Sequence, residues 1–372
     1  MKILFNVGQL LPQIAACASV ANTKNAIPIL DCVKLSVNAD AKKMSITSSD
    51  ADTWFETTCE IIDADENFQV CVETSVVLRT LQSLSQDTNV TMDVRSKVAM
   101  FSYNTGHFSI PFYDAKEFPV LPNDNDGLQF VVNADDINDA IVHTLFAIGV
   151  DVIRPILGSV RFDFKENQIV AAATDTSKLV RYINKVQQYF SSPIGFTLPS
   201  KPANVIKSMS AVQQITITLS DKRVSFNCDS FNMSTKLIEG NYPNYESVIP
   251  PTSTINVSIN RQNVLDAIRR VSIMGDNQSK EIKLKISSSS VYIKAQDEAI
   301  GKSGEELVEC TSDVRGTFDI SFISNHLIDV LKNITTDNVI MMFNAPDRAM
   351  VATVHESDKV ECTYLLMPLR QL

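Results

Sequence analysis

The sequence lacks the features by which membrane proteins and most nucleotide-binding enzymes are recognised. None of its apolar runs approaches the roughly 20 residues that a membrane-spanning helix requires. It contains neither a Gly-x-Gly-x-x-Gly turn nor a Gly-x-Ser-x-Gly elbow. The nearest match to a phosphate-binding loop is Gly301-Lys302-Ser303. A Walker motif requires another glycine five residues before Gly301, and that position is Gln296. Asp297 and Glu298 would also repel phosphate, so we do not expect a nucleotide site there.

Cysteine and histidine are scarce and scattered, and no pair of carboxylates stands out as an acid and base couple. The seven cysteines form no Cys-x-x-Cys pair, which is typical of free thiols in a reducing cytoplasm. The four histidines show no metal-ligand spacing, and we interpret His143 as a partly exposed helix residue. We therefore expect a cytoplasmic protein with no metal, no cofactor and no catalytic residue. The residues concerned are Cys17, Cys32, Cys59, Cys71, Cys228, Cys310 and Cys362, with His107, His143, His326 and His355.

The clearest pattern present is a helical segment that occurs three times. Apolar residues recur at three- and four-residue steps through residues 134–149, which predicts an amphipathic helix. Asp135 and Asp136 suit its first turn, and Gly149 suits its end. Similar segments begin at Gln9, after an amino-terminal strand, and at Arg261. The starts at residues 9, 135 and 261 are 126 residues apart each time, a domain-sized period that is too long for a solenoid.

Each of these helices is followed by alternating segments that predict half-buried strands, then by a second helix and two more strands. The second helices are predicted at 74–84, 200–210 and 324–334, with Thr74, Ser200 and Ser324 as N-caps. Asp50, Asp175 and Asp297 lie between strands and are interpreted as turn residues. The intervening strands are predicted at 33–37, 44–47, 53–61, 160–164, 168–174, 178–186, 282–286, 291–295 and 305–311. The pattern predicts an α+β chain of three tandem β-rich domains with two helices each, over residues 1–126, 127–252 and 253–372.

The charge of the chain is unevenly distributed. A net charge of −10 argues, as a bulk number, against binding to nucleic acid. Basic residues nevertheless gather on the predicted helices, and a surface made of those helices would be far more positive than the whole chain. The alternative is that these are ordinary solvated helix faces without a ligand. The basic residues are Arg79, Lys201, Lys207, Arg261, Arg269, Arg270 and Lys332, with Lys24 in the loop after the first helix.

An ordered set of short motifs along the whole chain resembles the bacterial β sliding clamps, the processivity subunits of DNA polymerase III. No single motif decides the resemblance, but together they span all three repeats. They are Ile27-Pro28-Ile29-Leu30, Phe118-Pro119, Arg154 with Leu157, Ala173-Thr174-Asp175 with Lys178-Leu179, Glu239-Gly240-Asn241-Tyr242-Pro243-Asn244-Tyr245, and Met367-Pro368-Leu369-Arg370.

The resemblance implies a head-to-tail homodimeric ring of two three-domain chains, with sheets outside and helices lining a hole for double-stranded DNA. DNA held topologically needs no sequence-reading residues, and a basic lining is compatible with an acidic exterior. Pro155 and Ile156 stand where the family carries aromatic residues near DNA. The DNA-lining residues that the resemblance implies are Lys24, Arg79, Lys201, Lys207, Arg269, Arg270 and Lys332.

The resemblance also implies a groove between the second and third domains that receives short peptides of polymerases, the clamp loader and repair proteins. An apolar groove with a few polar groups to fix direction suits an extended peptide. The residues that match it are Leu157, Thr174, Lys178, Leu179, Pro243, Val248, Leu365, Met367, Pro368 and Arg370. The sequence departs from the family at Thr176, Ser177, Ser247 and His326, so we expect a different peptide preference.

At the ring joint, Phe108 and Ile110 would meet Ile273 and Met274 of a second chain, unless these are ordinary core residues. The function expected on this basis is that of a sliding clamp that encircles DNA and tethers the polymerase, without an active site or membrane contact. Two alternatives stay open. One is a protein-interaction scaffold that never encircles DNA, and the other is a metal-dependent enzyme that uses residues such as Asp50 and Asp175.

Overall fold

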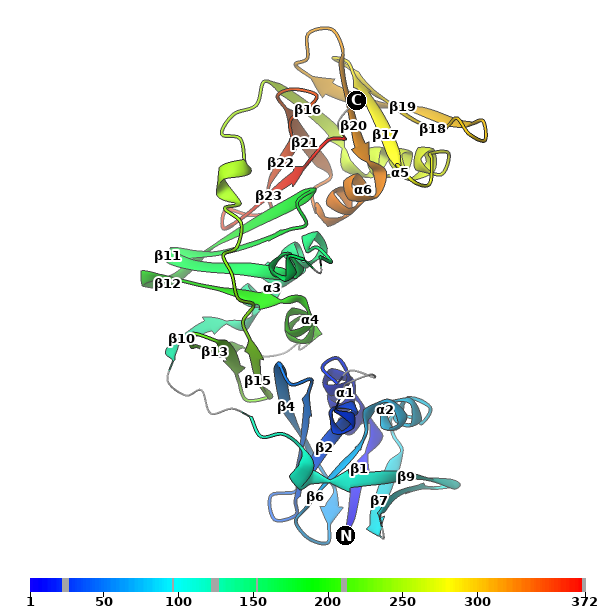
Figure 1. Cartoon of the computed structure of the whole chain (residues 1–372), viewed down its shortest axis with the longest axis vertical. Helices are drawn as coiled ribbons and strands as arrows, with labels where there is room; N and C mark the ends of the chain where they lie inside the picture. Colours follow the sequence, from blue (N-terminus) through cyan, green and yellow to red (C-terminus); the bar gives the residue numbers. More distant parts are fainter. Residues whose placement is uncertain (22–26, 96, 122–126, 152, 209–212, 370–372) are drawn as a thin grey trace. The chain divides into compact units, whose positions relative to one another are not determined.

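The computed structural model describes residues 1–21, 27–95, 97–121, 127–151, 153–208 and 213–369 (Figure 1). The chain forms two compact units. Unit 1 contains residues 1–138 and 201–237, and unit 2 contains residues 139–200 and 238–372. Within the described ranges, no helix is long and apolar enough to cross a membrane. Every strand pair is antiparallel, and the predicted α+β class is confirmed.

The same series of elements occurs three times, as the repeat analysis predicted. A strand leads directly into a helix, three strands follow, another strand leads into a second helix, and further strands close the series. The first series consists of β1 (Lys2–Asn6), α1 (Val7–Ala18), β2 (Cys32–Asn38), β3 (Lys43–Ser49), β4 (Thr53–Glu60), β5 (Asp63–Ala64), β6 (Phe68–Glu73), α2 (Thr74–Gln82), β7 (Asn89–Arg95), β8 (Val98–Tyr103) and β9 (Gly106–Asp114). Short 3₁₀ turns, η1 (Pro28–Asp31) and η2 (Ala115–Glu117), flank its strands.

The third series keeps this order, whereas in the second series two long strands stand between the two helices. The second consists of β10 (Leu128–Asn133), α3 (Ala134–Thr144), η3 (Leu145–Ala147), η4 (Pro155–Gly158), β11 (Ser159–Thr174), β12 (Lys178–Pro199), α4 (Ser200–Ser208), β13 (Gln214–Leu219), β14 (Arg223–Asn227), β15 (Phe231–Lys236) and η5 (Glu246–Val248). The third consists of β16 (Ile255–Asn260), α5 (Arg261–Ser272), β17 (Glu281–Ile286), β18 (Ser290–Asp297), β19 (Lys302–Ser312), β20 (Phe318–Ile323), α6 (Ser324–Asn333), β21 (Asn338–Phe343), β22 (Met350–His355) and β23 (Val360–Leu366).

The first helix of each series directly follows an asparagine that ends the preceding strand and caps the helix. The sequence analysis missed this signal. The side-chain oxygen of Asn6 accepts a hydrogen bond from the Gly8 N–H (2.9 Å), and that of Asn260 accepts one from the Asn263 N–H (3.0 Å). Asn133 accepts a longer one from the Asp135 N–H (3.3 Å). These bonds satisfy amide groups that have no partner inside the helix.

The N-caps predicted for the second helices are wrong, because each of the three residues, Ser200 of α4 included, is already the first residue of its helix. Thr74 and Ser324 are already helical, and the residues before them, Glu73 and Ile323, cap nothing with their side chains. The reason is that β6 and β20 run into α2 and α6 without a loop, so that Thr74 and Ser324 are buried. A residue buried between a strand and a helix follows the packing rather than the capping preference.

Two other element bounds differ from the prediction. The helix predicted to end at Gly149 ends at Thr144, whose hydroxyl donates to the Ala140 carbonyl (2.6 Å), and a 3₁₀ turn follows. Such a side-chain bond competes with continuation of the helix. The strands predicted at 160–164 and 168–174 form one strand, β11, whose register shifts around Glu166 (φ 51°). A bulge at that residue keeps both halves on the same ladder.

Each unit is built on one sheet that runs across a boundary between repeats. In unit 1, β15 pairs with β4, from Phe231 opposite Thr57 to Thr235 opposite Thr53. In unit 2, β12 pairs with β23, from Lys178 opposite Leu366 to residue 184 opposite residue 360. The compact units therefore do not follow the repeat boundaries, and the predicted boundaries after residues 126 and 252 remain predictions.

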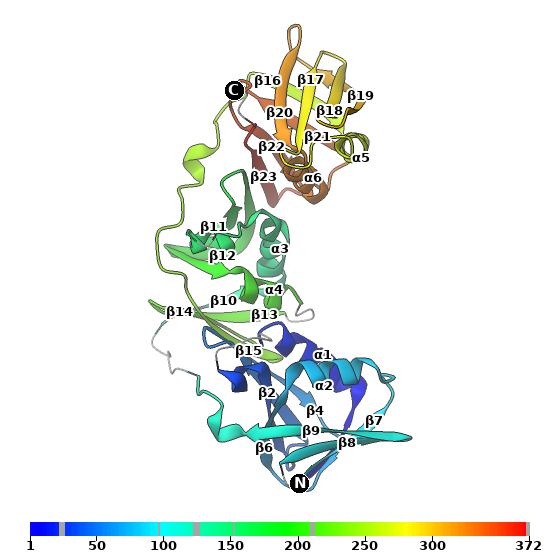
Figure 2. The same cartoon turned by 45° about the vertical axis from the view of Figure 1, so that its right-hand side comes forward.

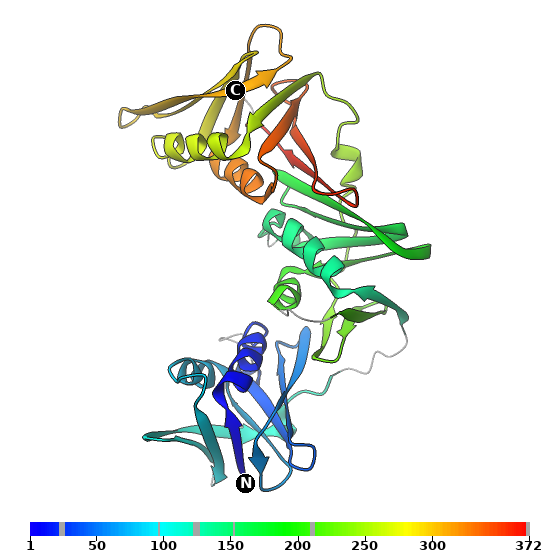
Figure 3. The same cartoon turned by 180° about the vertical axis from the view of Figure 1, so that it is seen from behind.

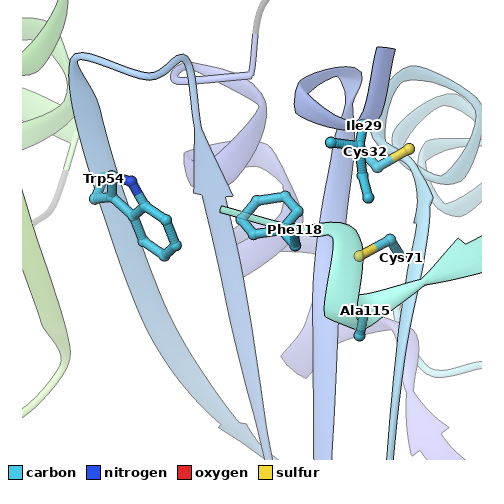
Figure 4. Packing of buried hydrophobic residues seen from close by; sticks show 6 residues of the cluster. All are labelled: Ile29, Cys32, Trp54, Cys71, Ala115 and Phe118. Carbon is cyan, nitrogen blue, oxygen red and sulfur yellow. The ribbon is translucent and has the colours of Figure 1, made fainter. Parts of the chain in front are cut away.

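Residues from the sequence motifs contribute to the core of unit 1. The rings of Trp54 and Phe118 meet edge to face, with centroids 5.6 Å apart and an interplanar angle of 82°. Figure 4 shows Ile29, Cys32 and Cys71 in the same buried cluster. All seven cysteines are free, as predicted. Burial raises the pKa of the Cys32 and Cys71 thiols to about 12, so that both stay protonated at neutral pH.

The three aspartates between strands are turn residues, as predicted. A carboxylate oxygen of Asp50 accepts hydrogen bonds from two backbone amides on the far side of its turn, and Asp175 does the same. Asp297 accepts one such bond. The residues that follow the first two, Ala51 and Thr176, both have a φ of 77°. A side chain costs energy in this left-handed region, and a β-branched side chain costs more than alanine.

We predict that Thr176→Gly stabilises the protein by about 0.5–1 kcal/mol. Relief of about 1–2 kcal/mol of left-handed strain outweighs the roughly 0.5–1 kcal/mol of extra chain entropy that glycine loses on folding. The matched control is Ala51→Gly, where the φ is the same but no β-branch is relieved, and its effect should be close to zero. Urea denaturation of both variants measures the difference. Equal shifts in the two variants would contradict the strain argument.

Candidate functional site

An open cleft of about 930 Å³ on unit 2 collects part of the predicted peptide groove. Val248 and Met367 both line it and are exposed by 54% and 44%, respectively. Exposed apolar side chains on a concave surface can contact a ligand without any rearrangement of the fold. Its lining residues are Ser247, Val248, Ile249, Pro250, Pro251, Asn344, Pro346, Asp347, Arg348, Ala349, Met367 and Leu369.

Other predicted groove residues lie in the core beside this cleft rather than on its surface. Leu179 and Leu365 stand opposite each other on β12 and β23 and are only 4% and 3% exposed. They belong to a buried cluster against which Ile249 and Ala349 of the cleft also pack. Leu179 and Leu365 therefore support the cleft, and a ligand would reach them only after these side chains move.

A second, smaller cavity of about 430 Å³ contains Leu157, together with Asp175 and Ser177. The backbone N–H of Met367 donates to the carbonyl of Ser177 (2.8 Å), so the carboxy-terminal tail connects the residues of the two cavities. The tail is held again where the Leu369 N–H donates to Ser321 (2.8 Å). β23 ends at Leu366, as the position of the predicted tail required.

Lys178 is a buried cation with two carboxylate partners. Its ammonium lies 3.2 Å from Asp175 and 3.3 Å from Asp329 on α6, and its side chain is 9% exposed. Thr174 donates to the backbone carbonyl of Lys178 (2.8 Å). The pKa of the His326 imidazole is lowered. Burial is the larger cause, and the nearby positive charge of Lys178 is the second. Lys178 thus acts as an ion-paired tie between β12 and α6 rather than as a free surface charge.

The remaining groove predictions fall outside these cavities. Pro243 is exposed beside Tyr242, whose ring packs on the buried cluster. Pro368 lies in the tail between Met367 and Leu369. Arg370 is outside the described residues. The sequence analysis missed Pro346 and Arg348, because a Pro-Asp-Arg turn after a strand carries no sign of a cleft, whereas Leu369 of the carboxy-terminal motif does line it.

The predicted DNA-lining residues separate into free and ion-paired cations. Arg79, Lys207 and Lys332 are exposed, and no ion pair of theirs occurs among the described residues. Lys201, by contrast, lies 2.5 Å from Asp50. Figure 3 shows α2, which carries Arg79, beside α1 in unit 1, and α6, which carries Lys332, beside α5 in unit 2. Lys24 lies outside the described residues.

Two arginines on α5 are also neutralised within the chain. Arg269 pairs with Asp266 (3.2 Å), and Arg270 makes two contacts with Glu306 on β19, at 2.5 and 3.0 Å. Glu306 raises the pKa of the Arg270 guanidinium, and Arg270 in return lowers the pKa of the Glu306 carboxyl. Both arginines remain largely exposed, so a phosphate group would have to compete with these carboxylates.

Each unit ends in a hairpin with one free strand edge (Figure 1 and Figure 2). β9 pairs with β8 along residues 106–111, but with β6 only along 112–114. β19 pairs with β18 along residues 302–309, but with β16 only along 310–312. Among the described strands, residues 106–111 and 302–309 therefore have no partner on their outer side.

The residues predicted at the ring joint lie close to these edges. Phe108 stacks on Phe101 with centroids 4.6 Å apart, and Ile110 is 6% exposed. Ile273 and Met274, just after α5, are 68% and 37% exposed. In the single chain, Ile110 is thus a core residue, whereas Ile273 is not.

Comparison with known proteins identifies the family. The DNA polymerase III beta subunit N-terminal domain matches residues 1–122, its central domain residues 131–244, and its C-terminal domain residues 246–370. The chain belongs to the DNA polymerase III beta subunit family. Its relatives include the beta sliding clamps of Treponema pallidum, 24% identical over all of both chains, and of Staphylococcus aureus, 26% identical over 97% of each.

Solved structures show the same clamp fold. The DNA polymerase III subunit beta of Pseudomonas aeruginosa bound to griselimycin aligns with a TM-score of 0.90 at 22% identity, over all of both chains. The beta subunit from Thermotoga maritima aligns equally well, with a TM-score of 0.90 at 19% identity. The resemblance inferred from the short motifs is thereby confirmed at the level of family and fold.

Two of the residues at which the sequence departs from the family's expected groove line the two cavities. Ser247 lines the larger cleft, and its hydroxyl donates to the Asn244 carbonyl (2.7 Å). Ser177 borders the smaller cavity, next to Thr176 in its left-handed turn. His326 lies by Lys178.

Proposed function

We propose that this family member acts as a DNA sliding clamp in the bacterial cytoplasm. Two chains close head to tail into a ring around duplex DNA, and the ring tethers the replicative polymerase and other replication and repair proteins. The chain would consist of domains at residues 1–126, 127–252 and 253–372, and would contribute no catalysis of its own. The beta sliding clamps among its relatives support this role.

The observation that carries the ring proposal is the pair of free strand edges. Inside the chain, the closing strand of one repeat pairs with a strand that lies between the two helices of the preceding repeat, as β15 does with β4 and β23 with β12. The strands left without such a partner are β19, the third strand of its repeat after α5, and β9, the closing strand of the first repeat. An antiparallel pairing of β19 with β9 of a second chain continues the same rule and closes a two-fold ring.

The charge distribution supports encirclement rather than specific recognition. A chain with a net charge of −10 repels DNA in bulk, yet it carries exposed cations on α2, α4 and α6 at Arg79, Lys207 and Lys332. Phosphate contacts of this kind give sequence-independent, salt-sensitive attraction. A ring needs no more than that, because topology rather than affinity holds it on the DNA.

The cleft around Val248 and Met367 is the proposed docking site for partner peptides. It offers exposed apolar side chains and the guanidinium of Arg348 on one concave surface. Leu157 in the neighbouring cavity would extend the site, with Leu179 and Leu365 beneath it. A peptide would enter in extended form along the tail at Met367.

The first prediction concerns ring closure. Native chain at micromolar concentration should show a mass near twice 41.2 kDa in light scattering. Ile273→Asp should give a mass near 41.2 kDa, because an unpaired charge buried at the joint costs roughly 3 kcal/mol or more, which is over a hundredfold in dimer affinity. Ile340→Asp, at a comparably exposed site on β21, should remain dimeric. A native monomer would contradict the ring.

The second prediction is topological. Clamp loader and ATP should leave the protein on nicked circular DNA, and cutting the circle should release it at once. Ordinary electrostatic binding would persist on the linear product, because the phosphates are unchanged. Gel filtration of the labelled protein with DNA, before and after cutting, measures retention. Persistence on linear DNA with free ends would contradict the ring in favour of ordinary electrostatic binding, and a failure to load would favour the scaffold alternative.

The third prediction concerns the cleft. Val248→Asp should weaken binding of a labelled polymerase-tail peptide by more than about tenfold, because one lost apolar contact costs roughly 1.5–3 kcal/mol of the about 8 kcal/mol in a micromolar complex. Because Val248 is exposed, its substitution leaves the core intact, whereas Leu179→Asp places a charge in the core. Val131→Asp, on the exposed side of β10 in unit 1, is the control. Fluorescence anisotropy that shows equal affinity in both variants would place the peptide elsewhere.

A further inference from the structure

Three potential metal ligands from distant parts of the sequence converge in unit 2. They are His143 in the last turn of α3, Glu356 directly after β22, and Cys362 in β23. One nitrogen, one carboxylate oxygen and one sulfur from these residues lie within 4.8 Å of one another. Among the described residues, this is the one group of three or more such side chains close enough to hold a metal ion. The function proposed above does not use it.

The hydrogen bonds of His143 fix which nitrogen faces the cluster. Its Nδ1 lies 2.7 Å from the backbone carbonyl of Asp139. A carbonyl only accepts, so Nδ1 must carry the proton and donate. In the neutral ring, Nε2 is then a bare lone pair, and it points at a carboxylate oxygen of Glu356 only 3.1 Å away. Two acceptors at this distance repel each other unless a cation, either a proton or a metal ion, lies between them.

The other members of the cluster are positioned as metal ligands usually are. The second carboxylate oxygen of Glu356 accepts a hydrogen bond from the Thr335 hydroxyl (2.7 Å). The imidazole of His143 stacks on Tyr182, with ring centroids 5.0 Å apart. Ligands oriented by a carbonyl, a hydroxyl and a stacked ring are held ready for an ion, and this outer support is typical of protein metal sites.

Cys362 supplies the third ligand from a fully buried position. It stands opposite Tyr182 on β12 and opposite Val354 on β22, so its backbone is fixed on both sides. A tetrahedral zinc ion keeps its ligand atoms about 3.3–3.8 Å apart, given bonds of about 2.0–2.3 Å. Closing the cluster from within 4.8 Å to that size needs side-chain movements on the order of 1 Å.

We propose that His143, Glu356 and Cys362 form a binding site for a divalent transition-metal ion, with Zn²⁺ as its chemical type. Mixed nitrogen, oxygen and sulfur ligation suits zinc rather than magnesium or calcium. The Cys362 thiol proton would leave to solvent as the zinc–sulfur bond forms. His143 and Glu356 have side chains that are 16% and 18% exposed, so water can reach the fourth position. The ion would join α3 to β22 and β23 within unit 2.

The test is metal binding by the full-length protein after treatment with a chelator. Cobalt(II) added to the native chain should produce a near-ultraviolet thiolate-to-metal charge-transfer band, with one ion per chain. Zn²⁺ should abolish this band by displacement and should raise the unfolding temperature. Cys362→Ser should lose the band and bind Zn²⁺ at least about a hundredfold more weakly, a larger effect than the ten- to hundredfold expected for the supporting variant Thr335→Val.

The matched control is Cys310→Ser, which removes a half-buried thiol of the same unit and should keep both the band and the affinity. Glu356→Gln provides a second ligand variant at a more exposed position, should Cys362→Ser unfold without metal. It too should lose at least about a hundredfold in Zn²⁺ affinity, beyond the effect of an outer-shell change. The absence of a thiolate band in the native chain, or equal zinc affinity in Cys362→Ser or Glu356→Gln, would overturn the proposal. A proton alone would then bridge His143 and Glu356.

Discussion

Backbone pairing between repeats is the constraint on which the rest of the structure depends. A sheet edge left open exposes unpaired N–H and C=O groups, which can form hydrogen bonds with a strand of another chain. β15 pairs with the edge of β4, and β23 pairs with the edge of β12. The backbone hydrogen bonds between consecutive repeats are therefore made within the chain. The placement of the helices, the buried tie of Lys178 to Asp329 and the ion pair of Lys201 with Asp50 all depend on these two ladders.

Much of the fold could be predicted from the sequence because it repeats. Six helices were expected near their observed positions, since apolar spacing on a helix face and a recurring period support each other. The strands that enter the second helices, such as β6 and β20, were missed. They are short, and they pass into a helix with no loop residues between, so no turn signal marks them. The capping role of Asn6, Asn133 and Asn260 was visible in the sequence but overlooked.

The candidate site was less predictable than the fold. Family resemblance assigned Leu179 and Val248 to one groove, but only the packing shows that Leu179 is buried and Val248 exposed. Cations on helices could be counted in the sequence, whereas their neutralisation by Glu306 or Asp50 depends on which strand or turn lies beside the helix. The cluster of His143, Glu356 and Cys362 could not be found by spacing at all, because its ligands are separated by as many as 219 residues and meet only through the pairing of β12 with β23.

The two kinds of contact in this molecule tolerate sequence change differently. Ladders between repeats use backbone groups, which every residue except proline supplies in full, so a clamp fold can persist in relatives that are only 19–26% identical. A cleft that binds a peptide uses side chains, and a single change there alters shape or charge. Ser177 and Ser247, two of the residues at which the sequence departs from the family's groove, line the cavities. On the functions proposed above, the same division lets a chain keep its architecture while its peptide preference, or the proposed metal site at His143, Glu356 and Cys362, changes.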